Sequence, residues 1–243
     1  MSGTRTLRGG TTRRRGGCLR TFVIALIALV VLLVAGDFAA KAFAENEIAG
    51  QIKSHGFPKK PSVSIEGFPF LTQVIGKDIH QVRISSQNIP EGPVDISRIS
   101  AVMNGIHLNG GFSSGTVDKL AGSVLVTFPS LAHTLNSRLG PLGALLSSSG
   151  LTLSAAGPDE VKASLNLLVA SGSATWRVTR LSGQDLQVRL VSSSGVPASA
   201  LSSLQTINIP IPKLPLGVKI DSVRITGQGV VGHISGRNLA FGG

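Results

Sequence analysis

One short segment has the sequence pattern that surrounds a catalytic serine in some enzymes. It is Gly111-Phe112-Ser113-Ser114-Gly115. It fits the pattern Gly-x-Ser-x-Gly, in which a serine on a sharp strand-to-helix turn acts as the nucleophile. That turn requires a buried strand before the motif and a helix after it. Here Asn109-Gly110 and Thr116 flank the motif in a Gly/Ser-rich stretch. A hairpin loop is therefore the favoured interpretation, and a nucleophilic Ser113 is the alternative.

The acidic and histidine side chains do not form a recognisable site either. Asp159 and Glu160 are adjacent and follow Gly157-Pro158, which indicates a solvated turn, since neighbouring residues on a strand point to opposite faces. A single cysteine, Cys18, excludes an intramolecular disulfide and zinc sites with two cysteine ligands. We therefore predict no catalytic cluster, no metal site and no cofactor. The histidines, which show no metal-ligand spacing, are His55, His80, His107, His133 and His233.

The charge of the chain is concentrated at one end. The formal net charge is +11, but six arginines precede Thr21, and from Glu45 onward 16 Lys or Arg stand against 11 Asp or Glu. The remaining cations are scattered, with Lys59-Lys60 as their only adjacent pair, and aromatic residues make up 4% of the chain. This pattern argues against a nucleic-acid partner, which needs a basic stripe with stacking aromatics. A mildly basic surface suits anionic lipid head groups.

The N-terminal arginines lead into an apolar segment. Phe22–Gly36 is fifteen residues without a polar side chain, somewhat short of the roughly 20 that span a bilayer. By the positive-inside preference, we predict a cytoplasmic tail at 1–20, a signal anchor or signal peptide at 21–36, and a single extracytoplasmic domain at 37–243. The domain would then lie on the outer, periplasmic side of the plasma membrane.

The residues after Gly36 bear on whether this segment is cleaved. Ala42-Phe43-Ala44 is a candidate cleavage site, which would give an exported form. However, residues 37–54 continue as an amphipathic helix, and an uncleaved anchor is the favoured interpretation. The apolar stripe predicted for this helix consists of Phe38, Ala42, Ala49 and Ile52.

Beyond Ser54 the apolar residues recur at every second position, which is typical of strands with one buried face. Pro129–Leu139 is predicted to be a helix, because proline suits a first turn and Gly140-Pro141 ends it. Pro197–Leu204 is a weaker helix candidate, and the prolines in Ile207–Leu216 indicate an edge or crossover segment. The alternating strands are His80–Ile84, Val124–Phe128, Val161–Leu167, Ala174–Val178 and Leu186–Leu190.

These patterns predict an α+β fold, with a long antiparallel sheet and a few helices along it. Its repeated apolar strand faces must be covered by helices, by a partner or by lipid acyl chains. From composition alone, a closed Leu/Val core is the favoured interpretation.

The segment Pro61–Gln73 bears on what covers these faces, through the family that it resembles. It joins a strand to an abrupt Gly-Phe-Pro-Phe-Leu turn and leads through Gly76-Lys77 into the His80–Ile84 strand. Together with the apolar segment, Asp37 and the following helix, this order resembles the LmeA-like family of actinobacterial envelope proteins. The resemblance implies a tubular lipid-binding-like fold, in which a curved sheet wraps one or two helices around an apolar groove. It also implies binding of phospholipids, including phosphoinositides, and a part in the maturation of mannosylated lipoglycans.

Our hypothesis is a non-enzymatic phospholipid-binding protein. Gly-Phe-Pro-Phe-Leu is either a structural turn whose phenylalanines plug the sheet or a direct lipid contact. The candidate apolar groove comprises Phe68, Phe70, Leu71, Val124, Val126, Phe128, Leu165, Leu167, Trp176 and Val178. The candidate head-group contacts are Lys77, Arg83, Arg177 and Arg189.

Two alternatives belong to other functional classes. The first is an assembly factor with a closed core that docks on an envelope glycosyltransferase. The second is an enzyme acting on lipid-linked sugars, which would need a site built from Ser113, His133, Asp159 or Glu160.

Overall fold

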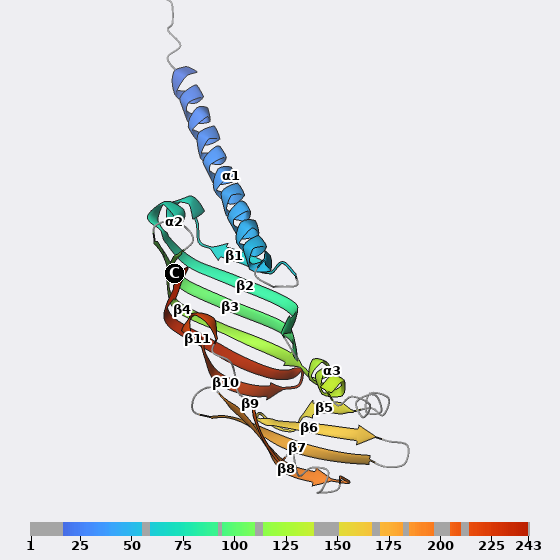
Figure 1. Cartoon of the computed structure of the whole chain (residues 1–243). Coiled ribbons are helices and arrows are strands. Elements are labelled where there is room, and N and C mark those ends of the chain that lie inside the picture. Colours follow the sequence, from blue (N-terminus) through green and yellow to red (C-terminus); the bar gives the residue numbers. More distant parts are fainter. Residues whose placement is uncertain are drawn as a thin grey trace, which may run out of the picture.

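The structure is a computed structural model that describes residues 17–54, 59–91, 94–109, 114–138, 151–166, 171–181, 185–196, 205–209 and 214–242. Antiparallel strands and a few helices make up this part of the chain, so the α+β class is confirmed (Figure 1). The helical elements are α1 (Gly17–Ser54), α2 (Phe70–Gly76), α3 (Phe128–Arg138) and the 3₁₀ turn η2 (Pro215–Gly217). The strands are β1 (Ser62–Glu66), β2 (Asp78–Glu91), β3 (Val94–Asn109), β4 (Ser114–Thr127), β5 (Thr152–Ala155), β6 (Glu160–Asn166), β7 (Ser171–Arg180), β8 (Leu186–Ser194), β9 (Thr206–Ile209), β10 (Lys219–Thr226) and β11 (Gly229–Phe241).

The strands divide between two sheets, where the sequence had suggested one long sheet. The larger sheet has the order β1-β2-β3-β4-β11-β10 and the smaller has the order β5-β6-β7-β8-β9. The chain leaves the larger sheet after β4, builds the smaller sheet, and returns as β10 and β11, with β11 pairing against β4. Helix α3 begins directly at the end of β4 and lies beside β5, where the chain passes from the larger sheet to the smaller one (Figure 1). The alternation of apolar and polar residues identifies strands but does not show which strands pair, so it could not predict the division into two sheets.

Helix α1 is continuous from Gly17 to Ser54, as predicted, and its two halves have different surroundings. From Arg20 to Gly36 every side chain except Val34 is exposed, and this half projects away from the sheets (Figure 1). The helix is long and apolar enough to cross a membrane, a property that signal sequences near an N-terminus share. The half after Gly36 packs against the larger sheet.

The packing face of this second half differs in part from the predicted stripe. Ala49 is buried and Ile52 is half-buried, as expected, but Phe38 and Ala42 are exposed. Helical stripes repeat at intervals of three or four residues, so a neighbouring set of apolar residues has the same period. The face that contacts the core consists of Ala40, Ala44, Ile48, Ala49 and Ile52.

The core lies between this helix face and one face of the larger sheet. Ile79, Ile106, Val117 and Leu239 form a cross-strand row through β2, β3, β4 and β11, and all four are buried. The strand β1 contributes Val63 and Ile65, and the α2 turn contributes Phe70. Phe70 therefore closes the end of the core nearest α2, as a plugging aromatic would.

Strand β2 departs from the strict alternation predicted for it. Val82 and Ile84 face the core as expected, but His80 is exposed and Ile79 is buried in its place. Opposite His80 lies Gly105, whose φ of +61° and whose contact with Asp118 leave no room for a Cβ atom. The pairing of β2 with β3 keeps its register across this point, while the inward face of β2 shifts by one residue between Ile79 and Val82.

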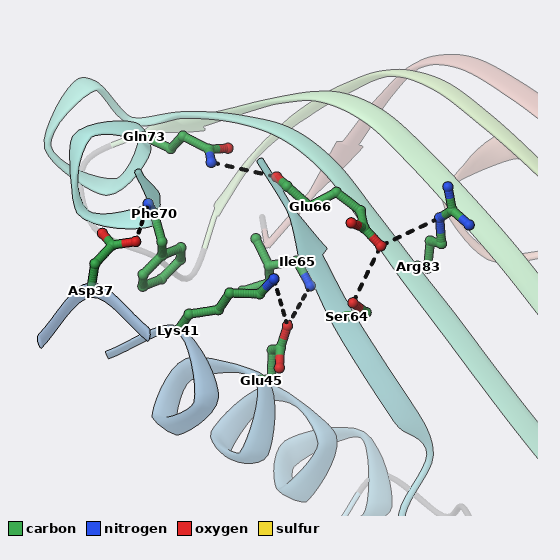
Figure 2. Close-up of polar contacts among 9 residues, drawn as sticks. All are labelled: Asp37, Lys41, Glu45, Ser64, Ile65, Glu66, Phe70, Gln73 and Arg83. Carbon is green, nitrogen blue, oxygen red and sulfur yellow. Dashed lines mark hydrogen bonds and ion pairs between the residues drawn. The ribbon is translucent and has the colours of Figure 1, made fainter. Parts of the chain in front are cut away.

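Polar contacts from α1 fix the turn that precedes α2 (Figure 2). The Asp37 carboxylate accepts a hydrogen bond from the Phe70 amide at 2.8 Å and another from the Leu71 amide at 2.7 Å. Pro69 occupies the N-cap position of α2 and has no side-chain group that could cap it. Asp37 is only 4% exposed, so its carboxylate satisfies two helix-terminal donors inside the protein.

Two further side chains hold the neighbouring backbone in place (Figure 2). The Glu45 carboxylate accepts a hydrogen bond from the Ile65 amide at 2.7 Å and lies 3.8 Å from the Lys41 ammonium. The Gln73 side chain accepts from the His80 amide at 3.0 Å and donates to the Glu66 carbonyl. The first contact joins α1 to β1, and the second joins α2 to the start of β2.

Three other sequence predictions concern segments beyond β4. The helix predicted at Pro129–Leu139 is α3, displaced by one residue, so Phe128 begins a helix where the strand pattern had included it. The edge character predicted for Ile207–Leu216 is confirmed where β9 forms the last strand of the smaller sheet. The helix candidate at Pro197–Leu204 lies outside the described residues.

We expect Asp37→Ala to lower the free energy of unfolding by about 2 kcal/mol, because two amides at the start of α2 lose their acceptor. Urea unfolding of the full chain in detergent micelles, followed by the fluorescence of Trp176, measures this. Glu47→Ala is the control, since Glu47 is an exposed carboxylate on the same helix. Equal effects of the two substitutions would contradict the role of Asp37.

Candidate functional site

The smaller sheet separates apolar from polar side chains. Cross-strand pairs place Val161 beside Trp176, Trp176 beside Leu190, and Val178 beside Val188. Because alternate residues of a strand share a face, these positions define one continuous apolar face through β5 to β9. Its members are Leu153, Ala155, Val161, Ala163, Leu165, Ala174, Trp176, Val178, Leu186, Val188, Leu190, Ile207 and Ile209.

The opposite face of this sheet is polar. Its cross-strand pairs include Lys162 with Thr175, Arg177 with Arg189, and Thr179 with Gln187. A sheet with one apolar and one polar face must cover the apolar one. Among the described members of the apolar face, only Ala174 is buried, and the others are half-buried or exposed. The described part of the chain thus leaves this face incompletely covered.

A second incompletely covered apolar surface lies on the larger sheet. Val124 pairs with Ile99, and Val126 pairs with Val230. These residues lie on the same face of the sheet as the core, but further along the strands. These four side chains are half-buried. The core-facing part of α1 packs on the other end of this face, around Ile79, Ile106 and Val117.

The two apolar surfaces meet where β10 adjoins β7. The Ile225 amide donates to the Pro158 carbonyl at 2.7 Å, and the Val178 amide donates to the Asp159 carbonyl at 2.8 Å. Ile225, which is buried, pairs with Val230, so it belongs to the same face as Val126. Val178 and Ile225 therefore lie on either side of one short link between the sheets.

The predicted groove residues fall into three groups. Phe68, Phe70 and Leu71 lie at α2, where Phe70 is buried and the other two are exposed. The second group lies at the opposite end of the larger sheet, and the third lies on the apolar face of the smaller sheet (Figure 1). The second group is Val124, Val126 and Phe128, and the third is Leu165, Trp176 and Val178. Leu167 lies outside the described residues.

The predicted head-group cations do not converge on one point. Arg177 lies 2.6 Å from Glu160 and 3.4 Å from Asp159, so it already pairs with two carboxylates. Arg189, its cross-strand neighbour, shares the polar face of the smaller sheet. Arg83 lies 3.7 Å from Glu66 and alternates with the core-facing Val82 and Ile84, which places it on the outer face of β2. Lys77 follows α2 and is exposed.

The structure adds a basic hollow that our candidate residues did not include. It has a volume of about 280 Å³ and lies where β1 begins beside the second half of β2. Ser86 is buried and pairs with Ile99, which pairs with Val124. The hollow therefore lies next to the apolar surface of the larger sheet. Its lining residues are Lys59, Lys60, Ser62, Ser85, Ser86, Gln87 and Asn88. The signal in the sequence was the adjacent lysine pair.

The residues considered for catalysis are not brought together. Asp159 and Glu160 pair with Arg177, while His133 is exposed on α3. Ser113 lies outside the described residues. His107 lies between Asp78, at 3.5 Å, and Asp118, at 3.3 Å, on the exposed face of the larger sheet. Within the described ranges, no group of three His, Cys, Asp or Glu side chains is arranged to hold a metal ion.

Comparisons with known proteins support phospholipid binding. A family model described as LmeA-like phospholipid-binding matches residues 35–235. Uncharacterized proteins from Mycobacterium bovis and from two strains of Mycobacterium tuberculosis are each 24% identical over 238 residues, covering 94% of this chain and 67% of the relative. No solved structure matches the chain significantly.

The ion pairs of Arg177 generate a prediction about stability. Arg177→Gln should lower the free energy of unfolding by at most about 1 kcal/mol, because half-exposed ion pairs are weak. The difference should shrink in 1 M salt, where the Debye length is about 3 Å. Arg189→Gln is the matched control on the same face, and urea unfolding measures both. A loss that is equal for the two variants, or insensitive to salt, would show that the carboxylates do not hold Arg177.

Proposed function

Because the chain belongs to the LmeA-like phospholipid-binding family, we propose that it binds a phospholipid through the apolar faces of its two sheets. The observation that carries this proposal is the apolar face of the smaller sheet, which the described chain leaves incompletely covered. Acyl chains are a suitable cover, since each buried methylene contributes about 0.8 kcal/mol. The protein acts as a binding protein, and the bond chemistry of the lipid is unchanged.

The acyl chains extend along two adjoining surfaces. One surface contains Ile99, Val124 and Val126 on the larger sheet, and the other contains Trp176 and Val178 on the smaller sheet. The link between Ile225 and Val178 supports a continuous path from one to the other.

The head group lies in the basic hollow at Lys59 and Lys60. This hollow adjoins the acyl surface through the row Ser86, Ile99 and Val124. Arg83, Arg177 and Arg189 project from outer or polar faces, so we assign them no direct contact with the bound head group. Two lysines, of which Lys60 also donates to the Asn46 side-chain oxygen, together with several hydroxyl and amide groups suit a phosphate that bears further hydroxyl groups, as a phosphoinositide does.

Helix α1 anchors the chain in the plasma membrane, and residues 37–243 lie on the extracytoplasmic side. The exposed apolar half of α1 and the arginines before it support this orientation. The anchored domain then takes its lipid from the bilayer beside it. The resemblance to lipoglycan-associated envelope proteins makes mannan maturation the process that we propose it serves.

Native mass spectrometry of the chain begun at Asp37 tests the function directly, because among the described residues every buried core side chain comes from Asp37 onward. We expect this protein to carry phospholipid when purified. Val178→Lys should reduce the lipid-bound fraction at least about tenfold, because a charge replaces an acyl contact. Thr179→Lys, on the polar face of the same strand, should leave it unchanged.

Two results would contradict the proposed function. One is wild-type protein that carries no lipid and extracts none from vesicles of phosphatidylinositol or phosphatidylglycerol. Such protein would favour the assembly factor, and capture of an envelope glycosyltransferase would then support that alternative. The other is an equal loss of lipid in Val178→Lys and Thr179→Lys, since only the first lies on the apolar face.

The head-group assignment predicts a separate effect. Lys59→Glu with Lys60→Glu should weaken binding of phosphatidylinositol by about 30-fold, since each lysine near a phosphate contributes on the order of 1 kcal/mol. Lys162→Glu with Lys219→Glu makes the same change in net charge at two exposed lysines elsewhere. Fluorescent-lipid titration compares the two double variants. Similar losses in both would show that overall charge, and not the hollow, attracts the lipid.

A further inference from the structure

The α2 turn carries exposed apolar side chains where it meets α1. Phe68 is 60% exposed, Leu71 is 39% exposed and Ile75 is 81% exposed. Phe38 of α1, 58% exposed, stacks on Phe68 with ring centroids 5.9 Å apart. We call these four side chains, Phe38, Phe68, Leu71 and Ile75, the apolar tip.

The apolar tip is unusual because it lies on the outward side of α2, whereas the inward side of this helix already packs in the core. Phe70 and Gln73 are buried, and Val74 packs against the core. Leu71 and Ile75 are four residues apart, so they lie together on the side that faces away from the protein. The outward side of a short surface helix is normally polar. Here it presents two large aliphatic side chains.

The orientation of Asp37 makes the tip continuous with the apolar half of α1. In the sequence, this carboxylate ends the apolar run at Gly36. In the structure it turns inward to the Phe70 and Leu71 amides and is only 4% exposed. The outward surface of α1 therefore carries no charge from Phe22 until Lys41.

The length of this surface matches a bilayer. Phe22 to Ala40 is 19 residues of helix, which span about 28 Å at 1.5 Å per residue. The hydrocarbon core of a bilayer is about 30 Å thick. If Lys41 marks the outer boundary, then Phe38 lies inside it, and Phe68, which stacks on Phe38, lies at the same depth.

From these observations we propose that the apolar tip inserts into the outer leaflet of the membrane, as a second contact beside the α1 anchor. The inference rests on the proposed anchoring by α1. Phe68, Leu71 and Ile75 occupy the boundary between head groups and acyl chains, where aromatic and aliphatic side chains are favourable. Lys77, exposed at the end of α2, lies at the level of the phosphates. The two contacts fix the tilt of the larger sheet against the bilayer.

Tryptophan fluorescence in vesicles tests the insertion. Trp176 is the single tryptophan of the chain, so Trp176→Phe gives a background without one. Into this full-length background, one variant adds Ile75→Trp and its control adds Val191→Trp. Val191 is exposed on β8, at the end of the molecule opposite α2 (Figure 1). Both are reconstituted into phosphatidylcholine and phosphatidylglycerol vesicles, with and without lipids brominated near the head-group end of the acyl chain.

We expect the emission of the Ile75→Trp variant to shift to shorter wavelength and to be quenched by the brominated lipid at least about twofold more than that of the Val191→Trp variant. Equal quenching of the two variants, with a water-like emission from the tryptophan at position 75, would overturn the proposal. A protein partner would then be the alternative that covers the apolar tip. If the Ile75→Trp variant fails to fold, Leu71→Trp provides the same measurement.

This experiment is independent of lipid binding by the sheets. Quenching at position 75 requires only that the tip contacts the bilayer, whereas native mass spectrometry of the chain begun at Asp37 measures lipid held without a bilayer. Quenching without bound lipid would support the tip and reject the proposed function. Bound lipid without quenching would support the proposed function and reject insertion of the tip.

Discussion

The Asp37 carboxylate joins the apolar helix to the folded part of the chain. It accepts the Phe70 and Leu71 amides, which α2 cannot satisfy from its own N-cap because Pro69 stands there. Phe70 is thereby held in the core, while Phe68 and Leu71 remain outside. The same contact removes a charge from the outer surface of α1. One buried carboxylate thus ties the start of α2 to the apolar helix, at the end of the core that Phe70 closes.

The second constraint is the covering of the apolar sheet faces. On the larger sheet, α1 packs over one end of the apolar face and leaves Val124 and Val126 half-buried. On the smaller sheet, the apolar face continues through all its strands and only Ala174 of its described members is buried. In our proposal a phospholipid satisfies this need, with its acyl chains on the apolar side chains and its phosphate near the lysines. The chain's membership of the LmeA-like phospholipid-binding family supports this proposal.

Much of the fold could be predicted from the sequence, because strand alternation is a local property. Alternation predicts the strands around Val161, Trp176 and Val188, and the apolar pattern predicts that α1 continues beyond Gly36, as the structure has them. The division into two sheets was not predicted, since pairing depends on residues far apart in the chain. The inward shift at His80 was also missed, because it depends on Gly105 in the adjacent strand. The inward turn of Asp37 could not be seen either, because its partners lie more than thirty residues away.

The candidate site was only partly predictable for the same reason. Alternation identified the apolar residues but could not say that Phe68 and Val178 lie at opposite ends of the molecule. It also could not show that Arg177 pairs with Asp159 and Glu160. Lys59 and Lys60 are adjacent in the sequence, but only the strand register shows that the hollow they line contains Ser86, which pairs with Ile99 of the apolar surface.

The most direct measurement of the central claim is photo-crosslinking with a phospholipid that carries a diazirine near the end of one acyl chain. After irradiation of the reconstituted full chain, peptide mapping identifies the residues that contact the chain end. Our account predicts labels within β6 to β8, on the face of Trp176 and Val178, in addition to those on α1. Labels confined to α1 and α2 would contradict it, because the lipid would then contact the anchor and the tip without entering the sheets.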